Sequence, residues 1–180
     1  MSYIQPADRS QVDSSVNATL DAIKAKLGKV PNLFLTLAHS PVALNAYVQL
    51  SDVAGRGKLN GKQREQIALA VGEVNNCDYC LAAHSAIGGM VGLKPAQIAA
   101  AREGRADTAR DTALLQLARS IIANQGHVST GELEAFKAAG LSDADVLEVL
   151  VSVVLNIYTN YTNHIARTEV DFPRAVPLAA

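Results

Sequence analysis

The chain has 180 residues, and its 16 basic and 17 acidic side chains leave a net charge of −1. This length suits a single domain with a sizeable core, and the charge balance argues against a protein dedicated to nucleic acids or membrane surfaces. A hydrophobic content of 49% excludes disorder as the main state. We expect one domain over residues 1–180, with an N-terminal arm at 1–12 and a C-terminal tail at 171–180.

The composition favours an all-α fold. Alanine, the best helix former, is abundant, whereas there is no tryptophan and there are only three phenylalanines and five tyrosines. The longest apolar run, around 149–157, is interrupted by Ser152 and Asn156 and falls short of the roughly 18–20 residues of a membrane span. The N-terminus is polar and there are only two cysteines, so the sequence predicts a soluble, cytoplasmic protein without a disulfide scaffold.

Apolar residues at helical spacing, separated by capping and helix-breaking residues, predict a series of helices. In chain order we expect them at about 14–27, 32–38, 41–55, 60–74, 77–87, 95–104, 108–124, 129–140 and 143–167. Asn76 is expected to cap the helix that begins at Cys77, and Gly88-Gly89 to end it. Asn60 and Ser142 each precede a helix rich in Ala, Val and Leu that ends in Asn before a tyrosine-containing stretch. This similarity predicts a repeated helical hairpin.

The segment from Glu73 to His84, E-V-N-N-C-D-Y-C-L-A-A-H, carries the residues best suited to chemistry. On a helix, Cys77, Cys80 and His84 share an arc of roughly 60°. The Cys-x-x-Cys spacing can close a small disulfide, and the His84 imidazole can approach the Cys80 sulfur one turn away. A thiol becomes nucleophilic as a thiolate, which a nearby base and a helix N-terminus both favour. The pattern therefore indicates redox chemistry at sulfur.

Other interpretations of this motif are simple core packing and a zinc site. Zinc would take Cys77, Cys80 and His84, with Glu65 or His164 as the fourth ligand, but structural zinc sites usually bring a second pair of ligands. A c-type haem needs His directly after the second Cys, where the chain has Leu81. A thioredoxin fold needs a strand before the motif. We therefore predict no metal and no cofactor.

A carboxylate is needed to complete a proton relay to His84. Glu65 begins an apolar stretch, Ile67 to Val71, whose helix we expect to be buried on more than one side. Glu73 is the competing candidate, although Asn75-Asn76 is expected to turn the chain between it and Cys77. The remaining histidines His39 and His164 are interpreted as packing or interface residues.

The residues give conflicting indications of which sulfur reacts first. The helix dipole favours Cys77, nearest the N-terminus, by roughly 0.3–1 kcal/mol. Histidine geometry favours Cys80, because His84 can take its proton directly. A base in hydrogen-bonding range should outweigh a screened dipole, so we assign the attack to Cys80. Cys77 is then the resolving sulfur, expected at the more exposed end of the helix.

The spacing of Glu65, Cys77-x-x-Cys80 and His84 resembles the signature of the AhpD-like alkylhydroperoxidases in the carboxymuconolactone decarboxylase superfamily. Three flanking segments, 30–34, 38–41 and 163–173, resemble the peroxidase-related branch of that family. The resemblance covers about residues 20–175 and implies an AhpD-like helical bundle with a repeated hairpin, assembled as a dimer, trimer or hexamer. True decarboxylases of the superfamily typically lack the cysteine pair, which argues against a lyase.

The resemblance implies a cofactor-free peroxidase that reduces small hydroperoxides. Glu65, Cys77, Cys80 and His84 match the family's relay and redox positions, and the family places the attacking sulfur at the second cysteine. An external dithiol of the lipoyl or thioredoxin type would reduce the resulting disulfide. The alternatives are a non-catalytic redox sensor, which oxidises once and stops, and a general thiol–disulfide oxidoreductase with no preference for peroxide.

Overall fold

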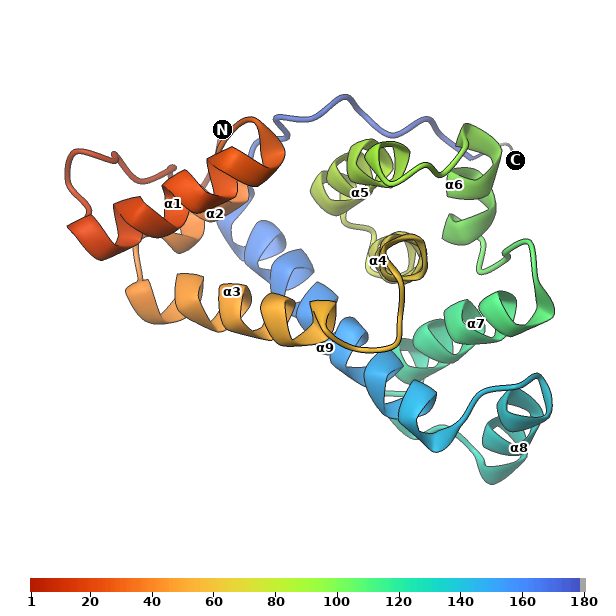
Figure 1. Cartoon of the computed structure of the whole chain (residues 1–180). Helices are drawn as coiled ribbons and strands as arrows, with labels where there is room; N and C mark the ends of the chain where they lie inside the picture. Colours follow the sequence, from red (N-terminus) through yellow and green to blue (C-terminus); the bar gives the residue numbers. More distant parts are fainter. Residues whose placement is uncertain (179–180) are drawn as a thin grey trace.

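The computed structural model describes residues 1–178, and these residues form α-helices without a β-strand (Figure 1). The all-α prediction is confirmed, and the helices lie close to the ranges that periodicity predicted. They are α1 (Ser14–Leu27), α2 (Asn32–Leu37), α3 (Pro41–Gly55), α4 (Gly61–Val74), α5 (Asp78–Met90), α6 (Pro95–Arg102), α7 (Ala109–Ala123), α8 (Thr130–Ala138) and α9 (Asp143–Ala166). Residues 1–13 and 167–178 contain no helix, while positions 179–180 of the predicted tail lie outside the described residues.

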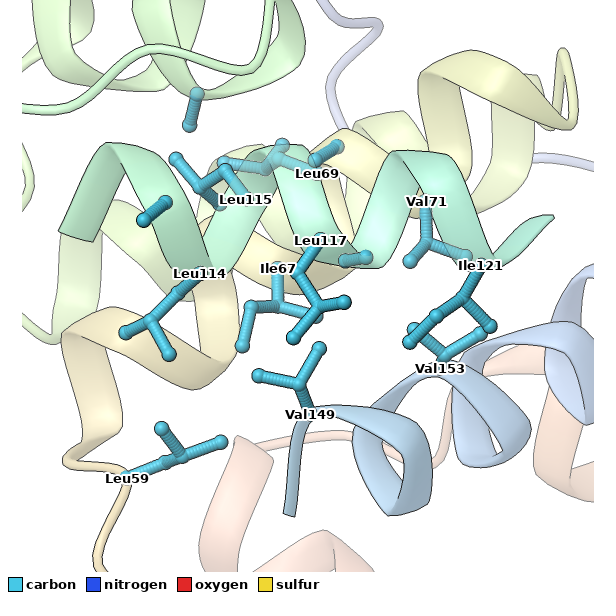
Figure 2. Close-up of a cluster of buried hydrophobic side chains, with 14 of the residues drawn as sticks. Leu59, Ile67, Leu69, Val71, Leu114, Leu115, Leu117, Ile121, Val149 and Val153 are labelled. Atoms are coloured by element: carbon cyan, nitrogen blue, oxygen red, sulfur yellow. The ribbon is translucent and has the colours of Figure 1, made fainter. Parts of the chain in front are cut away.

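Two clusters of buried side chains hold the helices together. The first lies mainly between α4, α7 and α9, where Leu69, Leu117 and Val149 are fully buried (Figure 2). The second joins α1, α2 and α3 to the first turns of α5 and includes both cysteines. Helices α4 and α9 contact each other as well as the neighbouring helices, and α4 is seen end-on at the centre of Figure 1. The cysteine motif is therefore part of a hydrophobic core.

Side-chain caps fix where α4 and α9 begin. Asn60 and Gln63 form a reciprocal capping box at α4, and Ser142 and Asp145 form another at α9. Each box satisfies backbone N–H groups that the first helical turn leaves without partners. Both predicted starts are confirmed. They could be predicted from the sequence because a capping box depends on residues only three positions apart.

Both predicted ends of α5 are wrong. Asn76 has a left-handed backbone with φ of 51°, so it cannot act as the N-cap, and Cys77 takes that position instead. At the other end, the helix continues through Gly88-Gly89 to Met90 and stops before Gly92, which has φ of 86°. Gly88 is needed for close packing, since a Cβ atom there would lie 3.2 Å from the Leu93 side chain.

The segment after α9 runs back across the molecule, over α5 and toward α6 (Figure 1). The Lys29 ammonium pairs with the Asp171 carboxylate at 3.0 Å and lies over the Phe172 ring. Arg102 on α6 donates to the Val176 carbonyl further along. These contacts place Phe172 beside the cysteine motif. In the part of the chain that the structure describes, no helix combines the length and apolarity needed to cross a membrane.

Candidate functional site

The two cysteines lie at the start of α5, where the chain turns out of α4. Cys77 and Cys80 are free thiols that come within 3.0 Å of each other, and they are 1% and 3% exposed. The turn is held by the Cys77 N–H, which donates to the Gly72 carbonyl. The predicted juxtaposition of the two sulfurs is therefore present, although Cys77 itself is not helical.

Glu65 and His84 are brought together between α4 and α5. The His84 Nδ1 and the Glu65 Oε2 are 2.7 Å apart, and both side chains are about four-fifths buried. The competing carboxylate, Glu73, points elsewhere and accepts a hydrogen bond from the buried Arg102 at 2.7 Å. Among the two predicted carboxylates, Glu65 is thus the partner of His84.

A cavity of about 250 Å³ opens beside this pair. Cys80, His84 and Glu65 line it, whereas Cys77 does not. Its other walls are largely apolar and come from α1 to α5, α9 and the segment after α9. They include four aromatic rings, from Phe34, Tyr47, Tyr79 and Phe172. The expectation that Cys77 lies at the more exposed end of the helix is wrong, since Cys80 is the sulfur that faces the cavity and Cys77 is packed behind it.

Three side chains of α9 contact or approach Cys80, and the sequence reasoning missed them. The Asn163 amide donates to the Cys80 sulfur at 3.3 Å, and Asn160 and Thr159 lie nearby. The sequence signal for these residues was that they are polar side chains in an otherwise apolar helix. Hydrophobic periodicity cannot show which partner such residues face.

The electrostatic surroundings distinguish the two sulfurs. The pKa of the Cys80 thiol is lowered, chiefly because the Cys77 thiol donates to its sulfur. Burial opposes this effect, and the hydrogen bond from the Asn163 amide adds to the lowering. The pKa of Cys77 is raised, because ionising it would break its hydrogen bond to Cys80 and because burial penalises its charge. Cys80 is therefore the sulfur whose thiolate this site favours.

The His84 imidazole is held in a state that suits proton transfer. Burial by itself would lower the pKa of His84, but the charge and hydrogen bond of the Glu65 carboxylate outweigh burial and raise it. A histidine with a raised pKa accepts a thiol proton more readily, and it then carries that proton as an acid.

Tyr79, between the two cysteines, connects the motif to α2 and to the segment after α9. Its hydroxyl donates to the Asp171 carboxylate at 2.7 Å and accepts from the Leu33 N–H at 3.1 Å. His39 contacts the Gln5 carbonyl, and the exposed His164 ring stacks on Tyr161, so neither joins the site. Within residues 1–178, no group of three or more His, Cys, Asp or Glu side chains is arranged to hold a metal ion.

We expect Tyr79→Phe to lower the free energy of unfolding by about 1–3 kcal/mol, because the buried Leu33 N–H loses its acceptor. Denaturant unfolding followed by circular dichroism measures this change. Tyr161→Phe is the matched control, because Tyr161 is half exposed, and its effect should stay within about 0.5 kcal/mol. Equal midpoints for the two variants would contradict the structural role of the Tyr79 hydroxyl.

The chain is similar to known proteins in sequence and in fold. The model of the carboxymuconolactone decarboxylase family matches residues 41–120, which include the whole motif. A peroxidase-related protein from Ralstonia eutropha JMP134, described as an alkylhydroperoxidase AhpD core, is 25% identical, with a TM-score of 0.86 over 94% of this chain and 92% of its own. No curated protein matches the chain in sequence at a significant level.

Two further solved structures share the fold at lower identity. A peroxidase-related protein from Silicibacter sp. TM1040 is 22% identical, with a TM-score of 0.80 over 93% of this chain and 92% of its own. The C82A variant of the debrominase Bmp8, in complex with 2,3,4-tribromopyrrole, is 18% identical, with a TM-score of 0.80 over 94% and 91%. The fold thus carries more than one activity. The family match over residues 41–120, the Ralstonia structure and the helical architecture together make the chain similar to the AhpD-like proteins of the carboxymuconolactone decarboxylase superfamily.

Proposed function

We propose that the protein is a thiol-dependent peroxidase that reduces small hydroperoxides with Cys80 and Cys77, in an antioxidant role. The observation that carries the proposal is the position of Cys80. It alone of the two sulfurs faces the cavity, with the Glu65–His84 pair beside it and Cys77 behind it. Substrate, base and resolving thiol then have separate places around one sulfur.

In the first step, the Cys80 thiolate attacks the terminal oxygen of the hydroperoxide. The S–O bond forms as the O–O bond breaks, and the alkoxide leaves as an alcohol after taking a proton. The product at Cys80 is a sulfenic acid. In the second step, the Cys77 sulfur attacks the Cys80 sulfur, and the sulfenic oxygen leaves as water. The protein now holds a disulfide and has supplied two electrons.

His84 and Glu65 move the protons in this scheme. His84 takes the proton of the Cys80 thiol and returns it to the departing alkoxide, while the Glu65 carboxylate stabilises the imidazolium between these events. An external dithiol, of lipoyl or thioredoxin type, then reduces the disulfide by thiol exchange and is itself oxidised to a disulfide. The cycle draws on no metal or organic cofactor.

We also infer that the protein works in the cytoplasm as a homo-oligomer. Exposed apolar side chains line α9 at helical spacing: Leu147, Leu150, Val154, Tyr161 and Ile165. A patch of this kind favours association with a second copy. Size-exclusion chromatography at micromolar concentration should show a dimer or larger species, and a monomer would contradict this inference alone.

Reductive debromination is a second candidate function. It is supported by the debrominase of the same fold and by the aromatic rings in the cavity wall beside Cys80. In this reaction the Cys80 thiolate would take bromine from a ring carbon, which takes up a proton in its place. Cys77 would then attack the Cys80 sulfur and release bromide as the disulfide forms, just as it releases water from the sulfenic acid. Bromide release from 2,3,4-tribromopyrrole would favour this function over peroxide reduction.

The test of the proposed function is a steady-state peroxidase assay run in parallel with dihydrolipoamide and thioredoxin as reductants. We expect repeated turnover of an alkyl hydroperoxide with at least one of the two. A single turnover that stops after one equivalent would instead indicate a redox sensor. Faster reaction with a disulfide substrate than with peroxide would indicate a general thiol–disulfide oxidoreductase.

A further inference from the structure

Helix α9 has a buried polar face within an otherwise apolar environment. Its members are Ser152, Asn156, Thr159, Asn160 and Asn163, each at most 6% exposed. Their spacing of four, seven, eight and eleven residues from the first places them on one side of the helix. Burying polar groups is costly unless they find partners, so this face needs a physical reason.

Local bonds account for only part of this face. The Asn156 amide donates to the Ser152 carbonyl, and the Thr159 hydroxyl donates to the Asn156 carbonyl. Asn160 and Asn163, one turn further along, face the cysteine motif instead. Their side-chain hydrogen bonds are made with residues outside α9, Asn75 for Asn160 and Cys80 for Asn163.

The orientation of Asn160 is fixed from α4. The Asn75 amide donates to the Asn160 Oδ1 at 2.8 Å, which leaves the Asn160 Nδ2 to point the other way. Among the described residues this buried Nδ2 group has no hydrogen-bond acceptor. The Asn160 backbone carbonyl also lies 4.0 Å from the Cys77 sulfur, so Asn160 is close to both cysteines.

Asn163 reaches the same sulfur from the next turn. Its Nδ2 donates to the Cys80 sulfur at 3.3 Å, and its own oxygen, buried like the Asn160 amide, has no partner within residues 1–178. The Asn160 and Asn163 amides, on successive turns of α9, thus lie next to the Cys80 sulfur, and neither residue lines the cavity.

We propose that the Asn160 and Asn163 amides form an anion-binding wall for Cys80, which holds the thiolate before attack. A thiol sulfur is a weak acceptor, whereas a thiolate accepts charge-assisted hydrogen bonds, which are about twice as strong as neutral ones. The unpartnered Asn160 N–H gains its acceptor only when negative charge develops at Cys80. The wall therefore favours the reactive state over the resting thiol.

This inference deepens the proposed function and rests on it, but the thiolate can be measured without peroxide. The Cys77→Ser variant has Cys80 as its single cysteine. The rate at which iodoacetamide alkylates Cys80 follows the fraction of this thiol that is ionised. Mass spectrometry identifies the product. The titratable groups that face Cys80 are His84 from its own helix, Tyr79, Tyr47 from α3 and Glu65 from α4, and all are left in place.

We expect Asn163→Leu and Asn160→Leu to shift the alkylation profile to higher pH by about one unit, which corresponds to about tenfold slower alkylation below its midpoint. Asn163→Asp keeps the size of the side chain and replaces the donor by a carboxylate, so it should shift the profile at least as far. Thr168→Val is the matched control, because it removes a buried hydroxyl that has no hydrogen-bond partner within residues 1–178 and does not line the cavity.

Folded variants whose alkylation profile coincides with that of the Cys77→Ser parent would overturn the proposal, even if their peroxidase rate fell. A merely structural role of the two asparagines would give that result. If the profiles shift but the protein turns over no peroxide, the wall stands as a property of Cys80 and the proposed peroxidase function fails. The two failures are therefore distinguishable.

Discussion

Cys80→Ser should abolish peroxide consumption and sulfenic acid formation, whereas Cys77→Ser should form one sulfenic acid and then stop. The reason is the arrangement at α5: Cys80 lines the cavity and its thiol has a lowered pKa, while Cys77 lies behind it with a raised pKa. One equivalent of peroxide, followed by a dimedone-type reagent and mass spectrometry, detects the sulfenic acid. The adduct is expected on Cys80 in the Cys77→Ser protein and absent in the other variant.

The reverse pattern would exchange the two roles. An adduct on Cys77 in the Cys80→Ser protein would mean that peroxide reaches the sulfur behind the cavity wall. The helix dipole would then outweigh the combined effect of His84 and the α9 asparagines. Circular dichroism of both variants is the control for folding, because each cysteine is part of a hydrophobic core.

Glu65→Gln and His84→Ala should each lower the peroxidase rate by about 10²–10⁴-fold, the usual size of general acid–base assistance. The two side chains are in contact at 2.7 Å, so the double variant should lose little more than either single one. Stopped-flow measurement of peroxide reduction gives these rates. Glu73→Gln is the matched control, because Glu73 pairs with Arg102 and should leave the rate close to that of the parent.

The pH profile separates the charge of Glu65 from its shape. The Glu65 carboxylate raises the pKa of His84, so the imidazolium that protonates the departing alkoxide persists to higher pH in the parent. Glu65→Gln removes that charge, and the falling alkaline limb of the profile should move to lower pH. An alkaline limb at the same pH in both proteins would contradict the relay.

The Glu65–His84 pair also contributes to folding stability. This contribution is present below the unfolded pKa of histidine and is lost as pH rises through the raised folded pKa.

The helices and their caps could be predicted from the sequence, because they depend on residues three or four positions apart. Helices α4 and α9 begin at the caps Asn60 and Ser142, and the apolar spacing after each cap indicates how far each helix continues. The link between Cys77, Cys80 and His84 is of the same kind, since all three lie within two helical turns. These interactions are local, so the linear order of residues contains them.

The errors at α5 have a tertiary cause. Asn76 is of a residue type that often caps helices, and Gly88 of a type that often ends them. In the structure, however, Asn76 has a left-handed backbone that turns the chain, and Gly88 lets Leu93 pack closely against the helix. Cys77, expected at an exposed helix end, is buried because α1 to α3 cover that end in the second cluster of buried side chains. No pattern within α5 itself contains this information.

The sequence by itself determined an all-helical chain with a paired thiol, a histidine one turn away and two candidate carboxylates. Only the tertiary structure decided between Glu65 and Glu73, because each carboxylate contacts a side chain of another helix, His84 for Glu65 and Arg102 for Glu73. It also decided which sulfur faces the cavity, and it brought Asn163 to Cys80 from 83 positions away. Such contacts depend on how whole helices pack, and helix packing depends on every buried face at once rather than on local spacing.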